Sequence, residues 1–306
     1  MLFAVGAGDL LVGRSHECDF PSEATRAPVL TAQRTPHFQA PEATGDRITA
    51  SASIDASVRA SLAAGQSLYT VDEALLAELR PDLILTQDLC AVCSIDLRSV
   101  QRVAASLSPA PRVLSFNPTG VWQVLDDLLA VGEAVGRESD ALRAVTALRD
   151  RWWTASDRVT PYVTGPCVLF LEWADPPFVG GHWTPHLIEA AGGRHPLNPA
   201  GAHSRVATAD EIIASAPDRI VICPCGLDLA RTRAAAREAA AQPWWSRTPA
   251  VQRGEPGAIM LVDGNQMFNR PGPRLVDAFE WLAAWIGERP ECAPSGFPAE
   301  PFPPNR

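Results

Sequence analysis

Short apolar runs alternate with segments of helical character along this chain, and each run is followed by a polar loop. The runs that show this pattern cover residues 81–86, 111–116, 167–171, 218–223 and 258–262. Short β-rich runs between helical segments are typical of βαβ units, whose strands are parallel. Ligands bind outside the carboxyl ends of the strands in such sheets. The loops after these runs, and the similar loop RSHECDFP at 14–21, are therefore the first candidates for a functional site.

Two segments, 70–90 and 208–225, share the same order of features. Each continues through Pro-Asp into an apolar strand and then a loop with a cysteine. Each begins with a T-x-x-E pattern, a capping box that starts a helix: Thr70 with Glu73, and Thr208 with Glu211. The repetition predicts two similar α/β lobes.

Residues 121–160, between the two segments, predict two helices. We expect Gly132 and Gly136 to end the first, and Ser139 or Asp140 to cap a second that runs to about Arg158. A helix of about 20 residues spans roughly 30 Å, enough for a stiff connector. The expected organisation is an N-terminal α/β lobe at 1–118, connecting helices at 119–160, a C-terminal α/β lobe at 161–290 and a proline-rich tail at 291–306.

Composition narrows the class of protein. With 306 residues and 46 % hydrophobic positions, the chain can bury a substantial core. Its net charge of −9 argues against binding to nucleic acid or to an acidic membrane surface. All 26 basic residues are arginine, which excludes lysine Schiff-base chemistry and a lysine-dependent phosphate loop.

The sequence also bears on the compartment in which the protein is found. No apolar run reaches the ~18 residues of a membrane span, so no membrane insertion is expected. The N-terminus lacks the basic region of a secretory signal, and seven cysteines, an odd number, do not suggest a disulfide framework. These features favour the cytoplasm.

Four cysteines lie in loops that follow predicted strands: Cys18, Cys90, Cys93 and Cys225. Cys-x-x-Cys is shared by zinc, iron–sulfur and redox sites, and two further thiols at the same edge strengthen that signal. His16 and Glu17 would add ligands. The alternative is that the cysteines act as small buried apolar residues and the polar loop is hydrogen-bonded structure.

Aromatic side chains alternate with glycine, proline and polar groups at 172–183 and 265–274. One interpretation is an apolar floor for a large planar ligand, and the other is packing beneath the loops. The floor would consist of Trp173, Phe178, Trp183 and Phe268, with Glu172, Asp263, Asn265, Arg270 and Arg274 around it.

His182 and His186 are spaced for one helix face, but Thr184-Pro185 predicts a helix start between them, so a metal pair is not expected. Nucleotide and G-x-S-x-G motifs are absent from the sequence.

The sequence resembles the cobalamin-binding, vitamin B12-type branch of the ABC-transporter substrate-binding proteins, and within it the signal-less bacterial subgroup with cysteine-bearing loops. The motifs that carry the resemblance span about residues 8 to 276: GDLLVGRSHECDFP, RPDLILTQDLCAVC, LEWADPPFVGGHWTPHLIEAAGG, ICPCGLD and VDGNQMFNRPGPR. The resemblance implies an α/β fold of class III periplasmic-binding-protein type. It has two Rossmann-like lobes with parallel sheets, one long connecting helix, little hinge closure and a corrinoid, haem or iron chelate held between the lobes.

By position, the resemblance implies a cleft lined by His16, Glu17, Cys18, Cys90, Cys93, Glu172, Trp173, Phe178, Trp183, Cys225, Asp263, Asn265, Phe268 and Arg274. Three departures matter. The strand that usually precedes the segment matching LFAVGAGD is missing, and His186 stands where an acidic residue is usual. A chain without a secretion signal also fits poorly with delivery to an ABC permease.

Three functions follow from these patterns. The first is binding of a cobalamin-like or other tetrapyrrole or metal-chelate ligand, without turnover. The second is a cytoplasmic enzyme or redox protein that uses zinc or an iron–sulfur cluster on the loop cysteines. The third is a structural or regulatory protein with a degenerate cleft. We expect the first.

Overall fold

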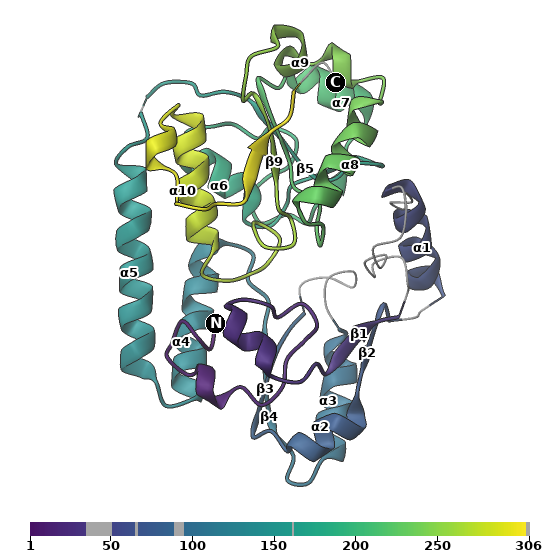
Figure 1. Ribbon diagram of the computed structural model, residues 1–306, viewed down its shortest axis with the longest axis vertical. Coiled ribbons are helices and arrows are strands. Elements are labelled where there is room, and N and C mark those ends of the chain that lie inside the picture. Colours follow the sequence, from purple (N-terminus) through teal and green to yellow (C-terminus); the bar gives the residue numbers. More distant parts are fainter. Residues whose placement is uncertain (35–50, 65–66, 89–94, 161, 304–306) are drawn as a thin grey trace. The chain divides into compact units, whose positions relative to one another are not determined.

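The chain forms two units, each with its own sheet structure (Figure 1). The structure is a computed structural model that describes residues 1–34, 51–64, 67–88, 95–160 and 162–303. Unit 1 comprises residues 1–45, 53–118 and 126–144, and unit 2 comprises residues 46–52, 119–125 and 145–306. The two helices α4 (Val121–Ala134) and α5 (Glu138–Ser156) contribute residues to both units.

The described residues of unit 1 form two pairs of strands. β1 (Thr31–Gln33) runs antiparallel to β2 (Tyr69–Val71), and β3 (Leu83–Gln87) runs parallel to β4 (Arg112–Phe116). Helix α3 (Leu97–Ser106) packs on β3 and β4 through a buried face. The strands predicted at 81–86 and 111–116 are thus confirmed. Two further helices are α1 (Ser51–Ala63) and α2 (Glu73–Leu79).

One of the two predicted capping boxes is wrong. Thr70 lies in β2 opposite Ala32, and α2 is capped instead by Asp72, whose carboxylate accepts from Leu75 N at 2.9 Å. Strand pairing fixes the backbone of Thr70, so the next acidic side chain takes the cap position. The Thr208–Glu211 box is confirmed at the start of α7 (Ala209–Ser215), with both reciprocal bonds present.

The break between α4 and α5 lies two residues later than Gly132 would place it. Gly136, at φ +67°, follows the end of α4. Gly132 remains helical, and a Cβ there would lie 2.3 Å from the Ala141 Cβ, so this glycine permits close approach of α5. Because α5 begins at Glu138, Ser139 and Asp140 lie within its first turn and do not cap it.

Unit 2 is built on a mixed sheet of the order β10-β9-β8-β5-β6-β7. The strands predicted at 167–171, 218–223 and 258–262 are confirmed as β5 (Val168–Trp173), β8 (Arg219–Ile222) and β9 (Ile259–Val262), which are parallel. The other three strands, β6 (Phe178–Val179), β7 (Arg205–Val206) and β10 (Ala299–Pro301), pair antiparallel. The link from β5 to β6 is too short for the crossover that a parallel neighbour needs.

Helices cover both faces of this sheet (Figure 1). Alternate strand residues such as Leu169, Leu171 and Ile220 pack with Ala235 and Ala239 of α8. The helices of unit 2 beyond α5 and α7 are α6 (Thr184–Ala190), α8 (Leu229–Ala240), α9 (Pro249–Arg253) and α10 (Leu275–Ile286). Short 3₁₀ turns occur at Gly8–Leu10, Ser22–Arg26, Trp245–Arg247 and Pro290–Cys292.

The proline-rich end of the chain supplies the edge strand β10, a role that its composition does not predict. Ala299 pairs with Val262, and Phe302 is buried with its ring 6.1 Å from that of Trp245. Proline is tolerated in an edge strand because its missing N–H faces away from the ladder.

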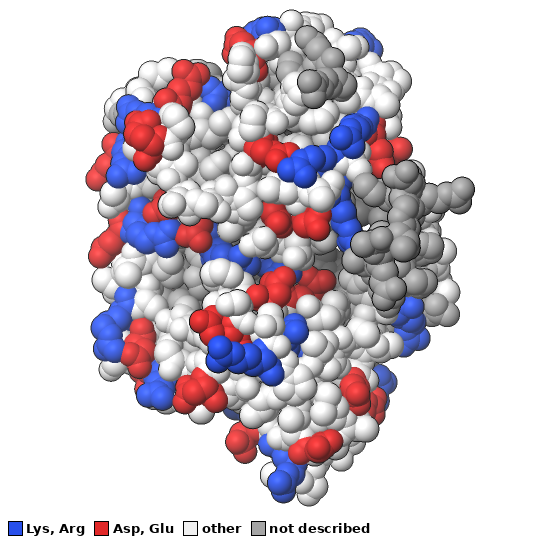
Figure 2. All heavy atoms as spheres, in the orientation of Figure 1, with Lys and Arg blue, Asp and Glu red and all other residues white. Residues whose placement is uncertain are grey.

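None of the described helices is long and apolar enough to cross a membrane. On the face drawn in Figure 2, acidic and basic side chains of the described residues are interspersed, and no extended basic surface is seen there.

Candidate functional site

The three parallel strands of unit 2 end in loops that bond to one another, and we call residues 172–177, 223–228 and 263–274 the strand-end loops. Cys225 N donates to Glu172 O at 3.1 Å, and Asn265 N donates to Leu227 O at 3.0 Å. A Cβ on Gly264 would lie 1.9 Å from Pro224 O, so only glycine allows this approach. The loops therefore form one continuous rim at the carboxyl edge of the sheet.

One buried and one half-buried polar side chain fix the shape of this rim. Asp263, 5 % exposed, accepts from Asn265 N and Gln266 N, each at 3.0 Å. Burial raises the pKa of the Asp263 carboxyl, and these hydrogen bonds oppose that effect. Asn269 Nδ2 donates to Cys223 O and Gly264 O, each at 3.0 Å, and so joins two strand ends. These groups build the loops.

Two arginines occupy the outer part of the third loop and are half-buried. Arg270 Nη2 donates to Asn265 Oδ1 at 2.8 Å. Arg274 Nη1 donates to Gln266 Oε1 at 3.3 Å. Guanidinium groups held in this way are suited to carboxylate or phosphate groups of a ligand, which they bind in a bidentate manner.

Glu172 connects the rim to two more loops, residues 180–183 and 201–204. Its carboxylate accepts from Gly181 N at 3.2 Å and from the Ser204 hydroxyl. A Cβ on Gly181 would lie 2.3 Å from Ser204 N, so the two loops touch through their backbones. His182 N donates to Ala202 O at 2.6 Å, which holds His182 at φ +51°, a left-handed conformation that is rare outside glycine.

This arrangement brings two imidazoles together. The rings of His182 and His203 lie 5.0 Å apart at 90°. His182 is half-buried and His203 is exposed. Burial lowers the pKa of His182, and His203 adds to this effect. Neutral imidazoles are hydrogen-bonding groups and good metal ligands.

His186 does not join them. Helix α6 begins at Thr184, one residue earlier than the sequence predicts, with Trp183 at the N-cap position. His182 precedes the helix as expected, and the His186 ring stacks on Trp152 at 5.8 Å. His182 and His186 thus have different ring partners, His203 and Trp152.

The four aromatic residues of the proposed floor occupy two layers. Trp183 and Phe268 are 4 % and 2 % exposed, and Trp183 Nε1 donates to Phe268 O at 2.6 Å. Trp173 and Phe178 are half-buried and pair across β5 and β6. The first two therefore pack beneath the loops, and the second two are more accessible to a ligand.

The described cysteines of the four-thiol hypothesis belong to different units. Cys225 of unit 2 is half-buried in the second loop, two residues after Cys223, whose thiol pKa is raised by complete burial. Cys18 is exposed in unit 1, and Cys90 and Cys93 lie outside the described residues. Within the described part of the chain, no three His, Cys, Asp or Glu side chains are placed to hold a metal ion. The four-thiol hypothesis therefore gains no support here.

The polar loop at 14–19 belongs to unit 1. His16 N and Nδ1 lie 3.0 and 2.6 Å from Thr31 Oγ1, and His16 Nε2 lies 3.5 Å from Glu17 Oε1. Arg14 donates to Cys18 O at 3.2 Å, which closes the turn. Local hydrogen bonds thus account for its shape, and a ligand role for His16, Glu17 and Cys18 stays a prediction.

Four polar residues of the site were not predicted: His203, Ser204, Gln266 and Asn269. His203 and Ser204 precede β7, whose two residues are too few to give a strand signal in the sequence. Gln266 and Asn269 lie in a loop already selected, where spacing alone does not show which amides bond inward.

A family model described as periplasmic binding protein matches residues 1–255, most of the chain. No curated protein matches the sequence. Solved structures match in fold. A periplasmic haem-binding protein from Pseudomonas aeruginosa has a TM-score of 0.68 at 18 % identity, covering 98 % of this chain and 90 % of that one.

Two further solved structures are similar over nearly the whole chain. The periplasmic haem-binding protein RhuT from Roseiflexus sp. RS-1 has a TM-score of 0.67 at 18 % identity, covering 94 % of each chain. The periplasmic vitamin B12-binding protein BtuF of Vibrio cholerae has a TM-score of 0.65 at 15 % identity, covering 94 % of this chain and 92 % of that one. At such identities the likeness shows the fold, which is the two-lobed α/β class that the sequence predicts.

Proposed function

The chain belongs to the periplasmic binding protein family, and from that premise we propose that it binds a metal-bearing tetrapyrrole, such as a corrinoid or haem, or a related iron chelate. The observation that carries the proposal is the rim of unit 2, where groups suited to such a ligand share one hydrogen-bonded set of loops. They are Glu172, His182, His203, Cys225, Asn265, Arg270 and Arg274. Similar folds named for haem and vitamin B12 binding support the ligand class.

Each part of the rim has a task in this proposal. The guanidiniums of Arg270 and Arg274 bind carboxylate or phosphate groups at the edge of the ligand. The imidazole of His203, which is exposed, donates its lone pair to the metal of the ligand or a hydrogen bond to its periphery. The half-buried rings of Trp173 and Phe178 offer apolar area to the flat face.

The proposed role is capture without turnover, with delivery of the ligand to an ABC permease. Affinity would come from apolar area buried on binding, at ~25 cal/mol per Å² before the cost of association. A rim held by backbone bonds and half-buried amides reduces that cost, because its loops are ordered before the ligand arrives.

Titration of the purified chain with haemin, cyanocobalamin, cobinamide and a ferric hydroxamate tests the ligand class. The proposal expects a saturable absorbance change or calorimetric signal with at least one of the four. Arg270→Gln is expected to weaken that binding about tenfold, the effect of one charge-assisted bond. Arg247→Gln, an exposed arginine in a 3₁₀ turn, is the matched control and is expected to bind as the wild type does. Absence of saturable binding to all four ligands would refute the proposal.

A further inference from the structure

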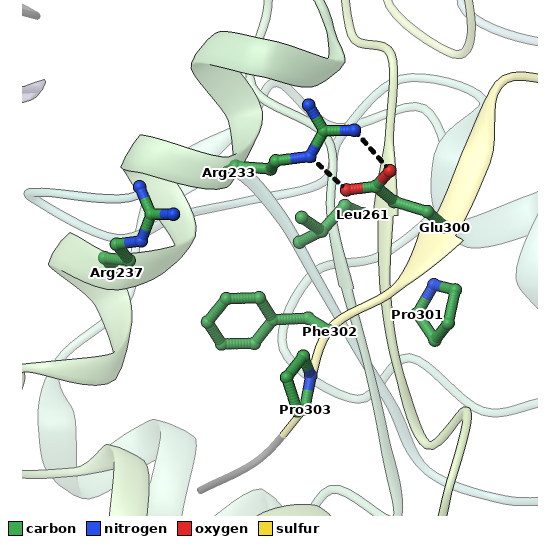
Figure 3. A pocket seen from close by; sticks show the side chains of 7 residues that line it. All are labelled: Arg233, Arg237, Leu261, Glu300, Pro301, Phe302 and Pro303. Carbon is green, nitrogen blue, oxygen red and sulfur yellow. Dashed lines mark hydrogen bonds and ion pairs between the residues drawn. The ribbon is translucent and has the colours of Figure 1, made fainter. Parts of the chain in front are cut away.

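A cavity of unit 2 lies between α8 and β10, and no residue of the strand-end loops lines it; we propose that it binds a small organic monocarboxylate with an apolar body (Figure 3). Its volume is about 200 Å³. It is lined by Arg233, Arg237, Leu261, Glu300, Pro301, Phe302 and Pro303. The ligand class follows from the charge, the walls and the size of this cavity.

The charge of the lining is not balanced. Arg233 Nε and Nη2 each donate to the Glu300 carboxylate at 2.5 Å, so this pair is neutral and both carboxylate oxygens are used (Figure 3). Arg237 lies one turn further along α8 and is exposed. Among the described residues it has neither an ion pair nor a side-chain hydrogen bond. One guanidinium therefore remains for an anion, and its planar fork fits a carboxylate.

The remaining walls are apolar. Leu261 and Phe302 are 1 % and 8 % exposed, so only a small part of each faces the cavity. Pro301 and Pro303 carry no N–H, so the backbone offers no donor at those positions to a second polar group. A ligand that places a carboxylate on Arg237 must therefore lay a hydrocarbon part against the ring of Phe302 and the prolines.

Size separates this site from the proposed main ligand. A cavity of about 200 Å³ has room for roughly six waters at ~30 Å³ each. That space accommodates a benzoate or a short branched carboxylate and is too small for a tetrapyrrole. Carboxylate binding in this cavity does not depend on the proposed function, so either proposal can fail while the other holds.

Calorimetric titration of the full chain with benzoate and isovalerate, against uncharged benzamide, tests the site. We expect saturable binding of a carboxylate and at least tenfold weaker binding of benzamide. Arg237→Gln is expected to weaken carboxylate binding at least tenfold, whereas Arg231→Gln, on the same helix but outside the lining, leaves it unchanged. Equal loss in both variants, equal binding of benzamide, or no saturable binding of either carboxylate overturns the proposal.

The ion pair between Arg233 and Glu300 allows a second test, in which carboxylate binding should become tighter instead of weaker. Glu300→Gln removes the carboxylate that occupies Arg233, so two guanidiniums become available and carboxylate binding is expected to tighten several-fold. Circular dichroism confirms that the variant is folded before the titration. A folded Glu300→Gln variant that binds carboxylate no better than the wild type would contradict the assigned role of Arg233 and Arg237.

Discussion

Two sets of polar side chains around the strand-end loops of unit 2 differ in what they bond to. The lower layer is Asp263, which is buried, and Asn269, which is half-buried, and both bond to backbone groups of the loops. The upper layer is His203, which is exposed in the neighbouring loop 201–204, and Arg270, which is half-buried and donates to the Asn265 side chain. We infer that the lower layer determines the shape of the loops, and we propose that the upper layer contacts the ligand. Substitutions in each layer should therefore change different quantities.

The largest effect is expected where the loops touch. Gly264→Ala places a Cβ 1.9 Å from Pro224 O, and backbone cannot move aside cheaply. We expect the free energy of unfolding to fall by about 3 kcal/mol, measured by urea denaturation. Gly272→Ala in the same loop is the control, because nothing lies within 4 Å of the position that its added methyl group would occupy. Similar stability of the two variants would show that the loops do not need this contact.

A smaller loss of stability is expected beneath the rim. Trp183→Phe keeps an aromatic ring but leaves Phe268 O without the indole N–H that lies 2.6 Å away. The loss of one buried hydrogen bond costs about 1–2 kcal/mol. Urea denaturation measures this change. An unchanged urea midpoint of unfolding would mean that the indole hydrogen bond contributes nothing to the stability of unit 2.

The buried His195 gives unit 2 a dependence on pH. Its ring is 4 % exposed and Nδ1 lies 2.9 Å from Val168 O. Burial lowers the pKa of His195 below its ordinary 6.5, so the unfolded chain takes up a proton first as pH falls. The stability that this group contributes is therefore present above pH 6.5 and is lost below it, by at most about 1.4 kcal/mol per pH unit.

The comparison that isolates this effect is between the wild type and His195→Gln. Unfolding free energies measured from pH 7 to pH 5 should fall more steeply in the wild type, because glutamine does not titrate. Other groups titrate in both proteins and cancel in the difference. Parallel curves would show that His195 is not the group responsible.

The smallest effect on stability is expected in the upper layer. His203 is exposed, so His203→Ala should change the unfolding free energy by less than about 0.5 kcal/mol. The same variant should weaken binding of a metal-bearing ligand, because an imidazole donor is lost. Thermal unfolding checks the first expectation and absorbance titration the second. A large loss of stability would place His203 in the lower layer.

The sequence predicts the parallel strands well because their apolar runs are continuous and the Pro-Asp steps mark where two of them begin. Once those strands are known, the position of the loops at their carboxyl ends follows from topology. Glu172, Asp263 and Arg274 were selected in this way, and the structure places all of them on the rim.

The sequence does not show which residues of these loops are buried and which are accessible. Trp183 and Phe268 lie in segments of the same composition as Trp173 and Phe178, yet they are buried and bond to each other through Trp183 Nε1 and Phe268 O. The antiparallel strands β7 and β10 are missed because two or three residues give no alternation to detect. The contact of His182 with His203 depends on Gly181 and Ser204 meeting across the sheet edge, a pairing that no local pattern encodes.

The most direct test of the central claim is the dissociation constant of the captured ligand, measured by absorbance titration for the wild type, Arg270→Gln and Asn269→Ala. We predict saturable binding by the wild type and about tenfold weaker binding by Arg270→Gln at unchanged stability. For Asn269→Ala we predict reduced stability, because that amide joins two strand ends. Wild-type binding of haemin or a corrinoid that Arg270→Gln leaves unaltered would contradict the assignment of the ligand to this rim.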